Sequence, residues 1–277
     1  MKKIQLFIFL FLPLSLLAQE ERHGFRFGLN MGMYFPSKIS ANYYNGSAQY
    51  SFSDPNEVRM YSIEERLRLT PQTIATITNA YNASGFHFNY DSYPAAMRYN
   101  GAFQMGVQVA FDVNNASCFF MNLNACKVKT VDRFTIVLEG TTQQQNMQED
   151  IRLFQIVGNE QRFNANLGYR TGWALEGNGL FFVQGGGSLL GTKVVSNQVF
   201  IANQTYDLII GAQNPNQIVN YIPRTGIGFG YFIGTGFFLP LGNQFAELSF
   251  NLSKDKMILN NNEFKGWNKV LTLSVSI

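Results

Sequence analysis

The sequence predicts an all-β fold, an eight-stranded antiparallel up-and-down transmembrane β-barrel with long extracellular loops, the first of which contains short helices. Three observations predict this fold. Apolar and small polar residues alternate along eight segments, only 14% of the residues are charged, and 25 of the 277 residues are glycine. Because ordinary soluble domains carry about 25% charged residues, this chain has little charge with which to solvate a large surface.

The first element is an expected signal peptide over residues 1–18. Two lysines precede an uncharged, mostly apolar run over residues 4–17, and the small residue Ala18 follows it. This order is typical of a secretory signal peptide, and the run is too short for a convincing membrane-spanning helix, which would be the alternative. Residues 19–277 are then expected to form one outer-membrane β-barrel domain.

Eight segments show the alternation expected of strands that are apolar on one face. In the first, Phe25, Phe27 and Leu29 occupy odd positions, while Arg26 and Gly28 occupy even ones. The eight expected strands are residues 24–35, 102–113, 118–126, 162–175, 180–195, 226–237, 246–252 and 271–277. The uncharged stretch 225–246 resembles a spanning helix in hydropathy, but its glycines and period-2 pattern favour a strand, a turn and a strand.

Two cysteines lie within the third expected strand. Cys118 and Cys126 are eight residues apart, so their Cα atoms should be roughly 26 Å apart at about 3.3 Å per residue. A disulfide requires Cα atoms within about 7 Å. Two free thiols on the same side of the sheet are therefore expected.

The residues on the polar face favour a membrane barrel over a secreted soluble β-protein. This face carries glycine, asparagine, glutamine and alanine instead of the lysine, glutamate and threonine of a water-facing strand. Eleven residues tilted by about 40° span roughly 28 Å, close to the apolar band of an outer-membrane barrel. Aromatic girdles are expected at the two rims, with Tyr34, Phe35 and Trp267 at one and Trp173 at the other.

Loop lengths predict the orientation of the barrel. Short turns are expected at residues 114–116, 176–179 and 239–244, and the alternate connections are long. Outer-membrane barrels place short turns in the periplasm and long loops outside the cell. Both termini are therefore expected in the periplasm, and the protein in the bacterial outer membrane.

Residues 24–277 resemble the small outer-membrane β-barrel families grouped with OmpX, the OmpA transmembrane domain and the PorT-like barrels associated with bacterial protein secretion. The resemblance rests on the signal peptide, the strand count, the loop asymmetry and an alternating C-terminal strand. Family members commonly end in an aromatic residue, whereas this chain ends in Ile277. The resemblance implies an envelope protein and points to a subunit role in an outer-membrane secretion or assembly complex.

Four charged residues fall on the polar face near the periplasmic end of their strands. They are Arg26, Asp112, Arg170 and Glu247, and we expect an ion network that closes the lumen there. An eight-stranded barrel has an interior just wide enough for side chains to fill, and charges inside a membrane are almost always paired. A gated conduit or proton path is the alternative, which would make the protein a narrow channel.

Catalysis would depend on one of two histidines, because few other side chains act as bases at neutral pH. His23 lies before the first strand, and His87 lies in the first outer loop near Ser84 and Asp91. A surface hydrolase or acyltransferase using His87 is the enzymatic alternative, and it requires these side chains to converge in space. The sequence assigns no catalytic residue and shows no metal-ligand spacing or nucleotide motif, so neither a metal nor another cofactor is expected.

The first outer loop, residues 36–97, is far longer than an ordinary connection, and such loops are usually functional or disordered. A capping box at residues 54–57 and the dipeptide Thr70-Pro71 predict two helices, the second ending at about Asn82. The loop also carries a set of aromatic residues, namely Tyr43, Tyr44, Tyr50, Phe52, Tyr61, Tyr81, Phe86, Phe88, Tyr90 and Tyr93. Either a lid over the barrel mouth or a surface for partners fits this composition.

The second outer connection predicts a hairpin that extends beyond the membrane. Residues 134–138 and 151–157 resemble strand extensions on either side of a polar tip, residues 140–149. Such a hairpin either pairs with a partner through its edge or simply protrudes.

These features predict a non-enzymatic structural or accessory protein of the envelope that acts through its outer loops. The expected partners are outer-membrane lipid, lipopolysaccharide and, through residues 36–97, other envelope proteins. No long cluster of lysine or arginine is present, so nucleic acid is not an expected partner.

Overall fold

The computed structural model describes residues 24–50, 52–53, 59–141, 149–175, 179–210, 225–241, 244–259 and 262–276. Several predictions lie outside these residues: the signal peptide at residues 1–18, His23, the capping box at residues 54–57, most of the polar tip of the second outer connection, and Ile277.

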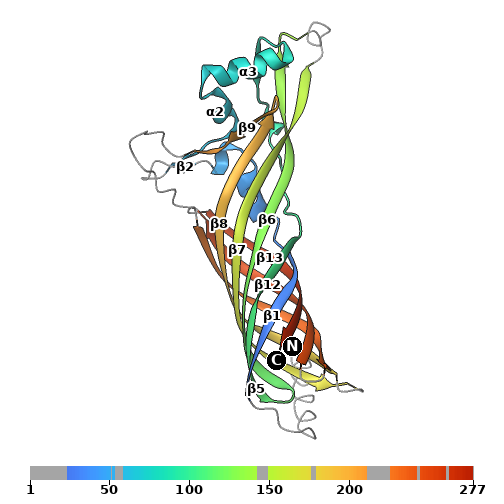
Figure 1. Ribbon diagram of the computed structural model, residues 1–277. Coiled ribbons are helices and arrows are strands. Elements are labelled where there is room, and N and C mark those ends of the chain that lie inside the picture. Colours follow the sequence, from blue (N-terminus) through green and yellow to red (C-terminus); the bar gives the residue numbers. More distant parts are fainter. Residues whose placement is uncertain are drawn as a thin grey trace, which may run out of the picture.

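Eight antiparallel strands form a closed ring (Figure 1). They are β1 (Gly24–Phe35), β5 (Ala102–Asn114), β6 (Ser117–Glu139), β7 (Asp150–Ala174), β8 (Leu180–Ile201), β11 (Thr225–Leu241), β12 (Gln244–Leu259) and β13 (Asn262–Ser276). Each strand pairs with the next in this order, and β13 pairs with β1. The predicted all-β class and the predicted number, order and direction of the strands are confirmed.

The two faces of the ring differ as the alternation predicts, because successive side chains of a strand point to opposite faces. On the outer face Phe25, Phe27 and Leu29 are 60–68% exposed. On the inner face Gln104 and Gln108 are at most 4% exposed. Glycine keeps the lumen narrow, since a Cβ at Gly234 would overlap the Asn251 amide on the neighbouring strand. The ring is therefore apolar outside and polar inside.

Three strands continue well beyond the ring. β6, β7 and β8 remain paired through Leu138↔Asp150 and Gln155↔Phe200, and we call their segments 127–139, 150–161 and 193–201 the protrusion. The ends predicted for these three strands fall short of the observed ends. The strand extensions on either side of the second outer connection were predicted. The protrusion rises above the ring in Figure 1.

The described residues of 36–101, together with residues 204–210, form a compact unit against the protrusion, which we call the cap. Its helices are η2 (Ser40–Tyr44), η3 (Ala48–Tyr50), α2 (Ile63–Arg68), α3 (Pro71–Tyr81) and η4 (Tyr90–Ser92). Its strands are β2 (Phe52–Ser53), β3 (Arg59–Met60), β4 (Gly85–His87), β9 (Gln204–Asp207) and β10 (Ile209–Ile210). β4 pairs with β6, β9 pairs with β8, and β10, β3 and β2 form a small sheet.

Local sequence signals explain where the cap helices begin and end. The Thr70 side chain accepts the Thr73 amide, Pro71 is the first helical residue, and Asn82 ends α3 with φ +50°, as predicted. α2 begins with a capping box between Ser62 and Glu65, which satisfies two otherwise unpaired backbone donors. This second box was not predicted from the sequence.

Two predictions about the outer rim are wrong. No long connection separates β12 from β13 in the described residues, because the two strands continue and pair as far as Leu259↔Asn262. Tyr34 does not belong to an outer aromatic girdle, since it points inward and is only 1% exposed. Phe35 and Trp267 are exposed on the outer face as predicted.

Cys118 and Cys126 are free thiols on β6, and both are buried, so the prediction of two unpaired cysteines is confirmed. No helix in the described part of the chain is long and apolar enough to cross a membrane.

Candidate functional site

The four charged residues singled out in the sequence lie at the end of the ring that carries the short turns, and we call them the turn-end cluster. Arg26 donates to both carboxylate oxygens of Asp112, at 2.5 and 2.8 Å. Arg170 donates to both oxygens of Glu247, at 2.6 and 2.5 Å. The first pair joins the neighbouring strands β1 and β5, whereas the second joins β7 to β12, which are not neighbours in the ring.

Aromatic rings and an amide complete the surroundings of the Arg170 pair. The guanidinium lies 4.0 Å from the ring centre of Phe182 and 5.1 Å from that of Phe120, and it donates to Gln184 at 2.9 Å. Stacking of this kind suits the planar guanidinium. The cavity beside the cluster is only about 20 Å³, roughly enough for one water molecule. The turn-end cluster therefore fills the lumen and leaves its charges balanced.

Amide and hydroxyl groups fill the middle of the lumen. Gln184 donates to Asn251 at 2.7 Å, Asn30 donates to Asn124 at 3.2 Å, and the cavity among these layers is about 20 Å³. The carboxylate of Asp255 accepts hydrogen bonds at 2.7 Å from the Ser253 hydroxyl and the Asn268 amide. Because buried polar groups are costly unless they are hydrogen-bonded, this network determines how the side chains pack.

A second buried ion pair lies where the ring meets the cap. Glu160 and Arg162, two residues apart on the inner face of β7, are 2.5 Å apart. Arg162 also donates at 3.0 Å to the Tyr34 hydroxyl and at 3.0 Å to the Ser40 hydroxyl. Ser40 belongs to the cap, so the Arg162 fork ties the cap to two strands of the ring.

Two cap tyrosines complete this cap-end cluster, which consists of Tyr34, Ser40, Tyr44, Tyr99, Glu160 and Arg162. Tyr44 donates to Glu160 at 2.8 Å, and Tyr99 donates to the same oxygen at 3.2 Å. Burial and then the charge of Glu160 raise the pKa of Tyr44 well above its ordinary value. The hydroxyl therefore keeps the proton that it donates. Arg162 begins the fourth expected strand on its polar face, whereas Glu160 lies before that strand and was not predicted, although both side chains lie on the same side of β7.

The aromatic set of the first loop serves mainly as a core. Tyr43 and Tyr44 are fully buried and Phe86 is 4% exposed. They belong to an apolar cluster with Leu190 of the ring and with residues of the protrusion, namely Phe134, Ile136, Leu138, Ile156, Val194, Val199 and Ile201. Tyr90 is fully exposed. Most of the described rings are therefore buried or partly buried and do not form an exposed binding surface.

His87 is paired with a carboxylate on the protrusion. Its Nδ1 lies 2.8 Å from Glu139 Oε1, and both side chains are partly exposed. Such a pair could orient a base, but a nucleophile must also lie within hydrogen-bond reach. Among the described residues, no hydrogen bond joins His87 to Ser84 or Asp91. The described residues also contain no group of three or more His, Cys, Asp or Glu side chains placed to hold a metal ion.

Comparisons with protein-family models and with curated proteins find no match to this chain. What the protein does must therefore be inferred from its own geometry.

Proposed function

We propose that the protein is an integral outer-membrane β-barrel with a closed lumen, and that it acts as a structural or accessory protein of the bacterial envelope through its cap and protrusion. The apolar outer face of the closed ring carries this proposal. Soluble monomers rarely expose contiguous apolar patches larger than a few hundred Å², whereas large apolar side chains lie exposed on all eight strands of this ring.

The inner face supports the same environment. A closed sheet leaves no unpaired backbone edge, which is the condition for strands to cross lipid. Small polar side chains and balanced ion pairs occupy the lumen, as expected where charges must be paired within a membrane. The resemblance to small outer-membrane barrels implies the same compartment and a role in an outer-membrane secretion or assembly complex.

The filled lumen favours a scaffold over a channel. The turn-end cluster, the amide layers and the cap lie one after another along the ring, with cavities of about 20 Å³ between the side chains. A diffusing solute larger than water would have to displace buried, hydrogen-bonded groups. The work of the protein is therefore assigned to its outer parts.

Membrane extraction and conductance test the barrel and its closed lumen. The protein should remain with the outer-membrane fraction after an alkaline wash and should migrate differently on SDS gels before and after boiling. In planar bilayers it should give no steady conductance on the nanosiemens scale. Release by the alkaline wash would overturn the membrane assignment, and steady open conductance would overturn the closed lumen.

The accessory role requires a surface on the cap. Replacing the whole loop would uncover its core, so a sharper test alters only exposed apolar side chains, in the double variant Leu69→Ser/Tyr90→Ser. Wild-type protein taken from native membranes in mild detergent should carry other envelope proteins, and this variant should lose them while still inserting. Ala75→Ser on the exposed side of α3 is the matched control. Recovery of the wild-type protein alone would contradict the accessory role.

A further inference from the structure

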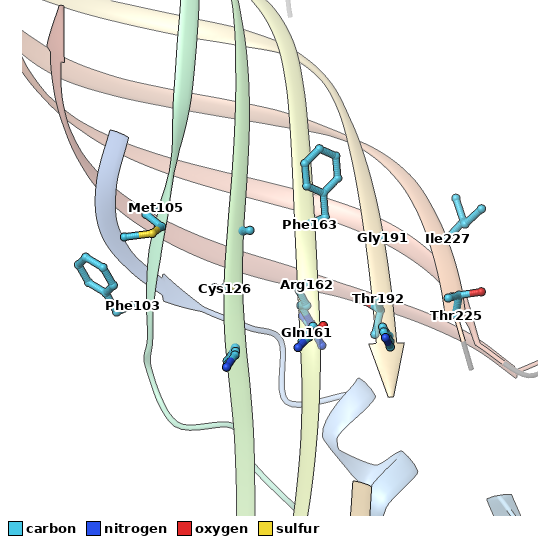
Figure 2. Close-up of a pocket in the computed structure, with 14 residues that line it drawn as sticks. Phe103, Met105, Cys126, Gln161, Arg162, Phe163, Gly191, Thr192, Thr225 and Ile227 are labelled. Atoms are coloured by element: carbon cyan, nitrogen blue, oxygen red, sulfur yellow. The ribbon is translucent and has the colours of Figure 1, made fainter. Parts of the chain in front are cut away.

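A hollow of about 980 Å³ lies on the outer face of the ring, where the protrusion begins (Figure 2). Its lining extends across five neighbouring strands, from Phe103 and Met105 on β5 to Thr225 and Ile227 on β11. This volume is at the upper end of the range typical of ligand sites. It is about fifty times the volume of the cavities within the lumen.

Two adjacent cross-strand rows give the hollow its chemistry. The apolar row consists of Ala125, Phe163, Gly191 and Ile227, each paired with the next across β6, β7, β8 and β11. Ala125 has a small side chain and Gly191 has none, so the surface at these two positions lies below the large Phe163 and Ile227 side chains. The row therefore forms an apolar floor with depressions between bulky groups.

The second row lies two residues farther toward the protrusion. It consists of Lys127, Gln161, Lys193 and Thr225, again paired in succession and all exposed. Because neighbouring strands are about 4.8 Å apart, the two lysine Cα atoms are roughly 10 Å apart. The flexible lysine side chains can converge over Gln161 on one anionic group.

The charge of the hollow is positive. Asp and Glu are absent from the side chains that line it in the described structure. Arg162, which also contributes to the lining, points inward and is neutralised by Glu160. The two lysines are therefore cations that face outward, with Lys129 exposed next to them on β6.

We propose that this hollow binds one phosphorylated membrane lipid, with an acyl chain on the floor and its phosphate between Lys127 and Lys193. The proposal rests on the outer-membrane function proposed for the chain. The apolar row lies on the ring side and the lysines on the protrusion side, which matches the polarity of a lipid whose headgroup faces outward. Two exposed lysines alone would not hold a free phosphate, so the floor must contribute to the affinity.

Binding to purified protein in neutral maltoside micelles tests the site. The probes are diphosphorylated lipid A, the same lipid with its phosphates removed, and inorganic phosphate. Native mass spectrometry and a fluorescence titration should detect one tightly bound phosphorylated lipid per chain. Removing the phosphates should weaken binding, and inorganic phosphate should neither bind nor compete at the same concentration.

Two variants separate the contributions of charge and floor. Lys127→Gln/Lys193→Gln should weaken binding of the phosphorylated lipid roughly 30-fold, from about fivefold per lysine near an anionic headgroup. Ala125→Trp should weaken the phosphorylated and dephosphorylated lipids alike, because it fills the floor. The matched controls are Lys254→Gln/Lys269→Gln and Ala246→Trp, which lie on the outer face of β12 and β13 away from the hollow; they should leave binding unchanged.

The outcomes distinguish this site from the membrane assignment. Equal weakening by the control lysine pair would show general attraction to charge, and binding of inorganic phosphate with similar affinity would show a phosphate site without lipid; either result overturns the proposal. Both results leave the membrane assignment intact if the variants still migrate as folded barrels before boiling. Release of wild-type protein by an alkaline wash would instead refute the proposed function itself.

Discussion

The ring and the cap bury opposite kinds of side chain. In the ring Leu29 is 66% exposed and Gln104 is 1% exposed, whereas in the cap Leu67 is fully buried and Gln72 is exposed. The cap follows the rule for proteins in water, and the ring reverses it. This difference supports the proposal that the ring lies in lipid while the cap lies in water.

Strand β6 runs from the ring into the protrusion beneath the cap, and its side chains show where the pattern of burial reverses. Near the turn end its outward residues are apolar, such as Phe119 and Met121, and Lys127 and Lys129 follow them in the protrusion. Its inward residues change in the other direction, from asparagines in the ring to Ile136 and other apolar residues under the cap. Both changes occur along one continuous strand, so the boundary between the surroundings is expected near Lys127.

The largest expected effect comes from breaking the ion pair across the lumen. Arg170→Ala should lower the free energy of unfolding by about 3–5 kcal/mol, because Glu247 would remain buried without a partner. Urea unfolding in micelles, followed by the fluorescence of the two tryptophans, measures the change. The double variant Arg170→Met/Glu247→Leu should restore most of the stability. A loss below about 1 kcal/mol in the single variant would show that the pair is solvated.

A cavity between the protrusion and the cap should destabilise the cap without destabilising the ring. Ile136→Ala removes a fully buried side chain beneath the cap and should cost about 2–5 kcal/mol of cap stability. Hydrogen exchange should rise in α3 and β4, while the amides of β1 and β12 stay protected. Equal loss of protection in the ring would show that the two regions unfold as one unit.

Introducing an arginine on the exposed face of each region compares their surroundings directly. Leu29→Arg on the outer face of β1 should cost about 2–4 kcal/mol if that face lies in lipid. Ala75→Arg on the exposed side of α3 should change stability by less than about 0.5 kcal/mol. Unfolding from lipid vesicles measures both changes. Two equally small effects would indicate that the ring faces water.

The smallest expected effect tests the start of α3. Thr70→Ala removes the side chain that accepts the Thr73 amide at 3.3 Å and should cost about 1 kcal/mol. Thr76→Ala, within the same helix and exposed, should be neutral or slightly stabilising, because alanine is a better helix former. Protection of α3 in hydrogen exchange checks both. Similar losses of stability in the two variants would contradict a specific role for Thr70 as the N-cap residue of α3.

The ring could be predicted from the sequence because its information is local. Alternation at period 2 is visible residue by residue, and it also gave the inward positions of Arg26, Asp112, Arg170 and Glu247. Which of these four side chains pair with one another depends on the register of the strands around the ring. That register brings together residues far apart in the sequence, such as Arg170 and Glu247. The members of the turn-end cluster could therefore be predicted from the sequence, whereas the two pairs could not.

The cap was harder to predict because its contacts are distant in sequence. Tyr43 and Tyr44 resemble exposed loop aromatics until the protrusion is known to pass above the ring and cover them. Glu160 lies between two expected strand segments, so its two tyrosine partners could not be anticipated. The extensions of β12 to Leu259 and of β13 back to Asn262 were missed because charged and polar residues hide the alternation there.

The continuous pairing of β6, β7 and β8 determines the reach of the molecule. From Lys127 to Glu139 the strand adds about 40 Å along its length, at about 3.3 Å per residue, and its described pairings with β7 continue as far as Leu138. In the proposed orientation the protrusion is a continuous three-stranded extension that holds α2, α3 and Tyr90 well away from the lipid surface. Partners with bulky folded domains could therefore dock without touching the bilayer.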